Sequence, residues 1–123
     1  LFLKKAQQFL KQETESPKKK SLLLQEMGKF YYAIEEWDQA EVAFRQSLNF
    51  TGNQPVSLYH LGVIAFAKKN LPDARLYFSR ILHSYRPEQF EMDDENIYVL
   101  SKHYLEILDR KEIRRASFKI ISS

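Results

Sequence analysis

Three histidines and one short acidic run are the residues of this 123-residue chain best suited to binding a metal ion. His60, His83 and His103 form neither an HxxxH pair nor an HExxH motif, the spacings that bring two imidazoles to one helical face. The acidic run at residues 93–95 stands at an expected helix start, where the helix dipole favours carboxylates. A metal site would need the fold to gather distant residues. We therefore expect no metal and no other cofactor.

The usual motifs of nucleophilic catalysis are also missing. The chain has no cysteine, which excludes thiolate nucleophiles, thiolate metal sites and disulfides. Gly28, Gly52 and Gly62 are its only glycines, too few for a phosphate-binding loop. Spacing alone does not exclude Ser-His-Asp catalysis, but no nucleophile motif is present. We expect no catalytic residues and no enzyme activity.

The charge pattern disfavours nucleic acid as a partner. The net charge is +3, and its sign alternates along the chain: +4 over 1–20, −3 over 21–54, +4 over 55–87 and −2 over 88–123. No segment offers the concentrated field of a nucleic-acid binder. The longest apolar run covers only residues 63–67, far short of the roughly 20 residues of a membrane span. We expect neither nucleic-acid binding nor a membrane span.

Two basic runs are the exceptions to this alternation. Residues 18–20 are three lysines inside the segment 14–20, which we interpret as a solvated turn. Residues 110–115 contain Glu112 and the apolar Ile113, a pattern typical of the exposed face of an amphipathic helix. Binding of RNA or a membrane surface through this second run remains an alternative.

A repeat of 34 residues organises the middle of the chain. Glycine and proline are scarce, three and four residues, which favours helices over β-turns. Small and large residues recur in phase, in the pairs Gly28 and Gly62, Trp37 and Leu71, Ala40 and Ala74, Phe44 and Phe78, and Leu48 and Leu82. A glycine inside a helix costs about 1 kcal/mol relative to alanine. We therefore expect both repeated glycines at close helix contacts, facing Ala40 and Ala74.

The pattern resembles the tetratricopeptide repeat, a helix–turn–helix unit of 34 residues. Two units match, at 21–54 and 55–88, and in both the glycine, alanine and phenylalanine stand at the family's positions. The resemblance implies an all-α right-handed superhelix, a solenoid of antiparallel helix pairs in one domain. We expect helices near 2–13, 21–35, 37–50, 55–69, 71–85, 94–109 and 110–121.

Both ends of the chain depart from the complete unit. Leu3, Ala6 and Leu10 repeat the stripe of a second helix, so residues 1–13 are interpreted as half of an earlier unit, or as a simple capping helix. A half-unit suggests that the chain is a fragment of a longer array. We also expect this chain to associate with itself through its terminal helices. Residues 93–122 are interpreted as a degenerate or capping helix pair, with Tyr104 at the glycine position and the register open.

The resemblance also implies a binding surface, because the first helices of the family line a concave groove. Its positions here include Leu22, Gln25, Lys29 and Tyr32 in one unit, and Tyr59, Val63 and Phe66 in the next. The family's carboxylate clamp needs Lys and Asn where this chain has Gln25 and Lys29, which argues against a chaperone-tail clamp. The groove is apolar and aromatic with one cation, and suits an amphipathic helix or an apolar extended segment. Alternatively, helices of the same or a neighbouring chain fill it.

These observations favour a non-catalytic protein–protein interaction module, a scaffold or adaptor whose partner is a protein or peptide segment. Two alternatives stay open: a small secretion-type chaperone that holds an apolar client, and an accessory repeat domain of a larger enzyme. We take the cytoplasm as the default compartment and leave the periplasm and others open. Trp37, at the start of a second helix, is expected to pack between adjacent units.

Overall fold

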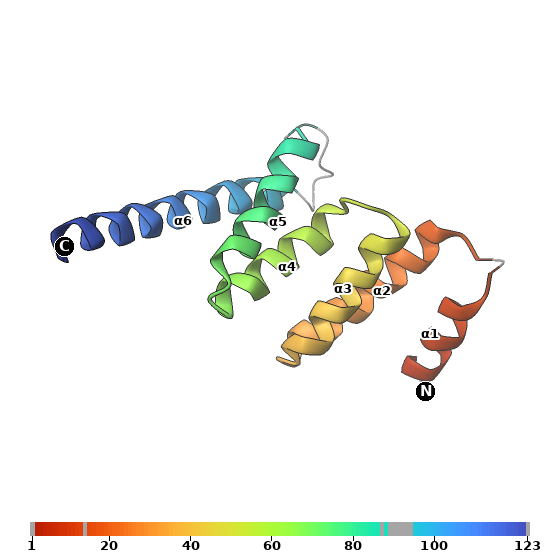
Figure 1. The fold of residues 1–123 in the computed structure, drawn as a ribbon. Helices are drawn as coiled ribbons and strands as arrows, with labels where there is room; N and C mark the ends of the chain where they lie inside the picture. The colour runs from red at the N-terminus through yellow and green to blue at the C-terminus, as the bar shows by residue number, and fades with distance from the viewer. Residues whose placement is uncertain (1, 14, 87, 89–94, 123) are drawn as a thin grey trace.

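The computed structural model describes residues 2–13, 15–86, 88 and 95–122, and within them the chain forms six helices and no strand (Figure 1). The all-α class expected from the sequence is confirmed. The helices are α1 (Phe2–Lys11), α2 (Pro17–Ala33), α3 (Trp37–Phe50), α4 (Pro55–Ala67), α5 (Leu71–Ser84) and α6 (Glu95–Ser122).

The helices pack in adjacent pairs along the chain. α2 packs most extensively against α3, and α4 against α5, as two helix hairpins lying side by side (Figure 1). α6 packs on α5 and also touches α4, whereas α1 makes only slight contact with α2. The last helix is therefore packed more extensively against its neighbours than the first helix is.

The 34-residue period recurs in the geometry of the two hairpin turns. In the first turn, the N–H of Glu36 donates to the carbonyl of Tyr31 at 2.9 Å, and Glu35 has a φ of 62°. In the second turn, the N–H of Asn70 donates to Ala65 at 2.8 Å, and Lys69 has a φ of 63°. α2 and α4 thus end at equivalent positions, each with a residue in the left-handed conformation and the same backbone hydrogen bond.

Each repeated glycine lies against a phenylalanine ring of its partner helix. A Cβ added at Gly28 would stand 2.7 Å from the ring of Phe44, and one at Gly62 would stand 2.7 Å from Phe78. The close contact is as expected, but its partner is the ring rather than the repeated alanine. The alanines one turn earlier are completely buried, and the ring that follows them fills the space over the glycine.

α2 begins four residues earlier than the sequence predicts, so the expected turn over 14–20 is wrong for its second half. The side chain of Ser16 accepts a hydrogen bond from the backbone N–H three residues on, and Pro17 occupies the first helical position. Lys20 consequently lies inside the helix and is buried, with its Nζ 5.5 Å from the ring centre of Phe50.

α6 is one continuous helix, so the helix pair expected over 93–122 is wrong. The segment 95–122 contains neither glycine nor proline, and nothing else in it stops a helix near residues 109–110. Its C-terminal half continues away from the other helices (Figure 1). The side chains of Ile113, Ala116 and Ile120, the expected stripe of the second helix, lie outside the described residues.

The register of α6 is set by Tyr104. Its ring stacks on Phe78 at 4.7 Å, as the ring of His60 stacks on Phe44 at 4.8 Å. Tyr104 therefore corresponds to the histidine position of the repeat and not to the glycine position. The correspondence extends to two more buried residues, because a separation of 44 residues relates Tyr104 to His60, Ser101 to Ser57 and Leu108 to Ile64.

Candidate functional site

The part of the predicted groove that belongs to α4 is occupied by α6. Tyr59, Val63 and Phe66 are half-buried, and all three pack in the cluster that contains Tyr104. The ring of Tyr104 lies 5.2 Å from that of Phe66, and the Nζ of Lys111 stands 5.0 Å from the Phe66 ring centre. At this unit a helix of the same chain packs against the predicted groove residues, which are left partly exposed.

The groove residues of α2 lie in dissimilar surroundings. Leu22 is 52% exposed, and Lys29 is exposed and pairs with Glu26 at 3.3 Å. Gln25 is instead buried, and its Nε2 donates to the hydroxyl of Ser21 at 3.2 Å. The structure therefore separates these residues rather than joining them in one surface.

Tyr32, the last predicted groove residue of α2, belongs to an aromatic cluster around His60. The two rings are 5.0 Å apart and nearly perpendicular, while the ring of Phe44 is stacked on the imidazole. Burial lowers the pKa of His60, although its Nδ1–H donates to the Val56 carbonyl at 2.8 Å. Trp37 lies against Tyr32 at 5.1 Å and is 41% exposed, so it packs mainly within its own unit.

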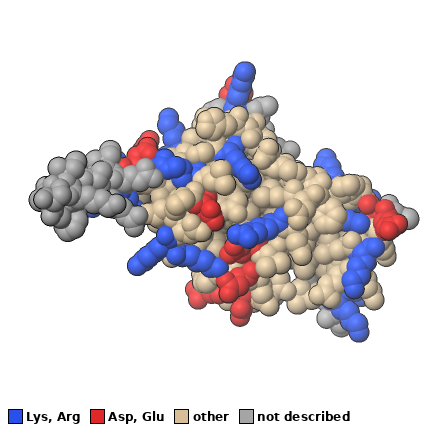
Figure 2. All heavy atoms as spheres, in the orientation of Figure 1, with Lys and Arg blue, Asp and Glu red and all other residues tan. Residues whose placement is uncertain are grey.

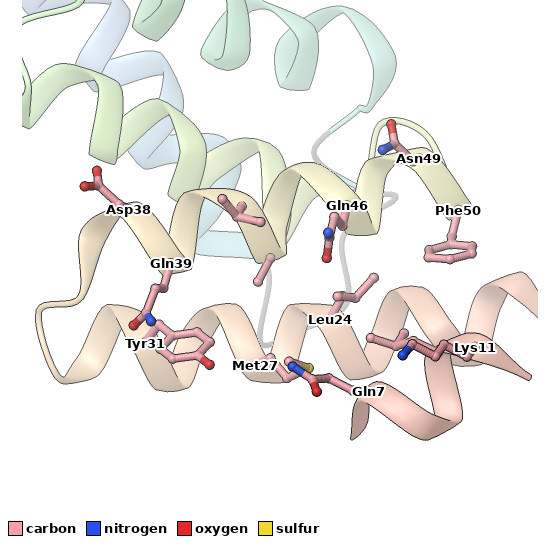
Figure 3. Close-up of a pocket in the computed structure, with 13 residues that line it drawn as sticks. Gln7, Lys11, Leu24, Met27, Tyr31, Asp38, Gln39, Gln46, Asn49 and Phe50 are labelled. Carbon is pink, nitrogen blue, oxygen red and sulfur yellow. The ribbon is translucent and has the colours of Figure 1, made fainter. Parts of the chain in front are cut away.

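A hollow of about 820 Å³ lies on the opposite side of the first hairpin, between α1, α2 and α3 (Figure 3). Its floor is formed by the α2 residues Leu24, Met27 and Tyr31. Val42 and Phe50 of α3 also line it, and they are 54% and 37% exposed. Leu24 and Met27 are themselves buried, so the apolar surface that is open to solvent here comes from Val42, Phe50 and the half-buried Tyr31.

Carboxamide side chains surround this apolar floor. Gln39 and Gln46 project from α3 on the side of α1, where Gln7 lies, while Asn49 of α3 points away from α1 (Figure 3). A carboxamide both donates and accepts hydrogen bonds, so this rim can pair with the main chain of a bound peptide without a charge requirement. We call the apolar floor and its carboxamide rim the amide-rimmed hollow.

Sequence reasoning missed this hollow because the repeat pattern assigns roles to core and groove positions and none to the outer face of α3. One signal could have revealed it. Val42 and Phe50 are large apolar residues of α3 that fall outside the core positions of the repeat. Such residues on the outer face of a second helix indicate a further surface that another element can cover.

Exposed apolar side chains are distributed unequally between the two hairpins. Of the ten large exposed hydrophobic residues in the described part of the chain, six belong to residues 21–54 and one to residues 55–88. The six are Leu22, Phe30, Ile34, Trp37, Val42 and Phe50, and the one is Leu76. The first unit is therefore the less completely covered of the two.

Charge and metal chemistry offer no competing site in the described part of the chain. Basic and acidic side chains are both spread over the face in Figure 2, with the largest acidic group at its lower edge. No group of three or more histidine and acidic residues able to hold a metal ion occurs among the described residues; Asp93 and Asp94 lie outside them. None of the described helices is long and apolar enough to cross a membrane.

Comparisons of the chain with protein-family models, with curated proteins and with solved structures gave no match. The resemblance to tetratricopeptide repeats therefore depends on the repeated sequence pattern and on the repeated turn and ring geometry alone.

Proposed function

We propose that this chain is a non-catalytic protein-interaction module that holds an apolar or amphipathic segment of a partner protein in the amide-rimmed hollow. The observation that carries the proposal is the exposed apolar lining of this hollow, in which Val42, Phe50 and the half-buried Tyr31 surround the buried Leu24 and Met27. A monomeric protein rarely leaves contiguous apolar surface uncovered without a partner for it.

The chemistry of the hollow defines the segment that it suits. Apolar side chains on one side of the segment would rest on Met27 and Val42, and aromatic or branched residues gain most from such burial. Polar main-chain or side-chain groups at its edges would pair with Gln39 and Gln46. An amphipathic helix or a short extended segment meets both conditions.

The repeat geometry supports a tetratricopeptide-like scaffold for this module. The two hairpins have the same local structure, because their glycine–phenylalanine contacts and their left-handed turns lie at equivalent positions. In our proposal, continued stacking of such hairpins produces a right-handed superhelix. The predicted residues Leu22, Lys29 and Tyr32 would then belong to a second face, on the other side of α2 from the hollow.

Selection from a displayed peptide library tests the proposed site and requires no candidate partner. We expect peptides selected on the wild-type chain to bind Val42→Asp about ten-fold or more weakly, because a carboxylate then stands in the apolar floor. Leu76→Asp is the matched control: Leu76 occupies the same repeat position, is 50% exposed and lies outside the hollow.

Both variants should melt as the wild type does, because both positions are at least half exposed. Peptides that bind Val42→Asp and wild type equally well would place the interaction elsewhere. A library that yields no apolar or amphipathic sequence would contradict the function itself.

A further inference from the structure

A second hollow, of about 610 Å³, lies where α3, α5 and the loop between α3 and α4 meet. Leu48 and Tyr77 line it, and both also pack against the buried cluster around Phe44. The two hairpins thus contribute one residue each to the same apolar base. Because that base is tied to the core, the side chains around it are held by well-packed helices.

Two arginines face this base from neighbouring turns of the two helices. Arg45 precedes Leu48 by three residues on α3, and Arg80 follows Tyr77 by three residues on α5. Arg45 already pairs with Glu41 at 2.7 Å, which leaves part of its guanidinium fork available. Arg80 has no hydrogen bond or ion pair with any described residue.

The loop side of the hollow is polar and fixed in place. Asn49 and Asn53 line it together with Gly52. The hydroxyl of Tyr85 donates to the carbonyl of Asn53, and Asn53 is in the left-handed conformation with a φ of 59°. This cross-link holds the loop against the end of α5, and Asn53 of the loop and Asn49 of α3 line the same hollow as the two arginines.

We propose that this hollow binds a carboxylate side chain, an Asp or Glu within an acidic segment of a partner protein. Glu41 also pairs with Lys68, which pairs with Asp38, so Arg45, Arg80 and Lys68 stand against two carboxylates and leave a net charge of about +1. One carboxylate neutralises this charge, and a phosphate dianion exceeds it. Leu48 and Tyr77 suit the aliphatic residue beside such an acid. The site shares Asn49 with the lining of the amide-rimmed hollow, but neither its arginines nor its apolar base belongs to that hollow, and it does not depend on the function proposed there.

The probe is the capped tetrapeptide acetyl-Ala-Glu-Leu-Ala-amide, added to the ¹⁵N-labelled chain and followed by NMR. We expect saturable shifts of the backbone amides of residues 48–53 and 77–80, and none with the Gln-containing analogue. Binding should weaken as salt is raised, as an exposed ionic contact requires. Equal shifts with the Gln analogue would overturn the proposal, and so would inorganic phosphate that binds at these amides more tightly than the peptide.

Three variants complete the test. Arg80→Gln should weaken the binding of the Glu peptide by about five-fold or more, because the unpaired guanidinium is lost. Arg110→Gln, which removes an exposed arginine from α6, should leave it unchanged. Val42→Asp should also leave it unchanged, so that a failure of this site and a failure of the amide-rimmed hollow remain distinguishable. Unaltered binding by Arg80→Gln would overturn the assignment.

Discussion

The two hairpins share a backbone plan but have different neighbours. Gly28 and Gly62 meet their rings at the same distance, yet the α4 face is covered by α6 while the first hairpin exposes six large apolar residues. The difference shows that repeat positions specify the hairpin, whereas the residues between them decide whether its outer faces are closed within the chain. The open unit is therefore where a partner is expected.

The junctions that follow the two hairpins also differ in chemistry. Between α2, α3 and α4, buried hydroxyls form a network in which Ser21 donates to the Ser47 carbonyl at 3.1 Å and Ser47 bonds to Ser57. Between α4, α5 and α6, the corresponding contacts are made by aromatic rings, with Tyr104 stacked on Phe78. The same helix-hairpin plan thus accommodates both a polar and an aromatic junction.

The largest expected effect tests whether the hairpins are equivalent. Phe44→Ala and Phe78→Ala should each lower the free energy of unfolding by about 3–5 kcal/mol, because each ring is completely buried over a glycine. Urea unfolding followed by circular dichroism measures both. A loss of less than about 1 kcal/mol at one ring would show that only the other hairpin carries the core.

Overpacking at the repeated alanines should have the next largest effect. Ala40→Leu and Ala74→Leu add three carbons at positions with no exposed surface, and each should cost about 1–3 kcal/mol. Thermal melts provide the measurement, with Ala67→Leu as a control at an exposed position. Unchanged melting of both buried variants would refute the repeat register.

A pair of equivalent serines should respond with opposite signs. Ser57→Ala removes the partner of the Ser47 hydroxyl and should cost about 1 kcal/mol. Ser101, at the corresponding place in α6, is completely buried and its hydroxyl has no hydrogen-bond partner among the described residues. Ser101→Ala should therefore stabilise the chain by about 1 kcal/mol. Equal signs in urea unfolding would contradict the correspondence of the two junctions.

The smallest expected effect is the pH dependence of the junction that contains His60. Burial lowers the folded-state pKa of this imidazole, so below its ordinary pKa of about 6.5 the unfolded chain binds the proton more readily. Stability contributed by neutral His60 is complete above that pH and falls as the solution is acidified. His60→Phe should reduce the difference between melting temperatures at about pH 7.5 and pH 5.5, whereas His83→Gln should not.

The sequence was sufficient for the helices that obey the repeat. Trp37, Pro55 and Leu71 begin α3, α4 and α5 as predicted, because a proline or the repeat itself marks each start. The start of α2 was missed since the lysines after Pro17 were interpreted by their charge, although Ser16 and Pro17 together are a helix-start signal. Capping residues such as Ser16 and Pro17 therefore predict the start of a helix better than the charge of the residues that follow them.

The candidate site was less predictable, because it depends on which element covers which face. Placing Tyr104 at the glycine position implies a separation of 42 residues from Gly62, whereas the ring stacking gives 44 residues between Tyr104 and His60, and the sequence pattern does not resolve this difference of two residues. Without the register of α6, Tyr59 and Phe66 looked available for a partner. The burial of Gln25 likewise depends on a hydroxyl supplied by Ser21, a contact between two polar residues that the pattern of apolar residues cannot show.

The left-handed residues that close the two hairpin turns have a consequence for redesign of this protein. Glu35 and Lys69 carry full side chains in a conformation that costs a non-glycine residue about 1 kcal/mol or more. Asparagine adopts that conformation more readily, and neither position contributes a buried side chain. Glu35→Asn and Lys69→Asn together offer a route to a more heat-resistant variant that leaves both hollows untouched.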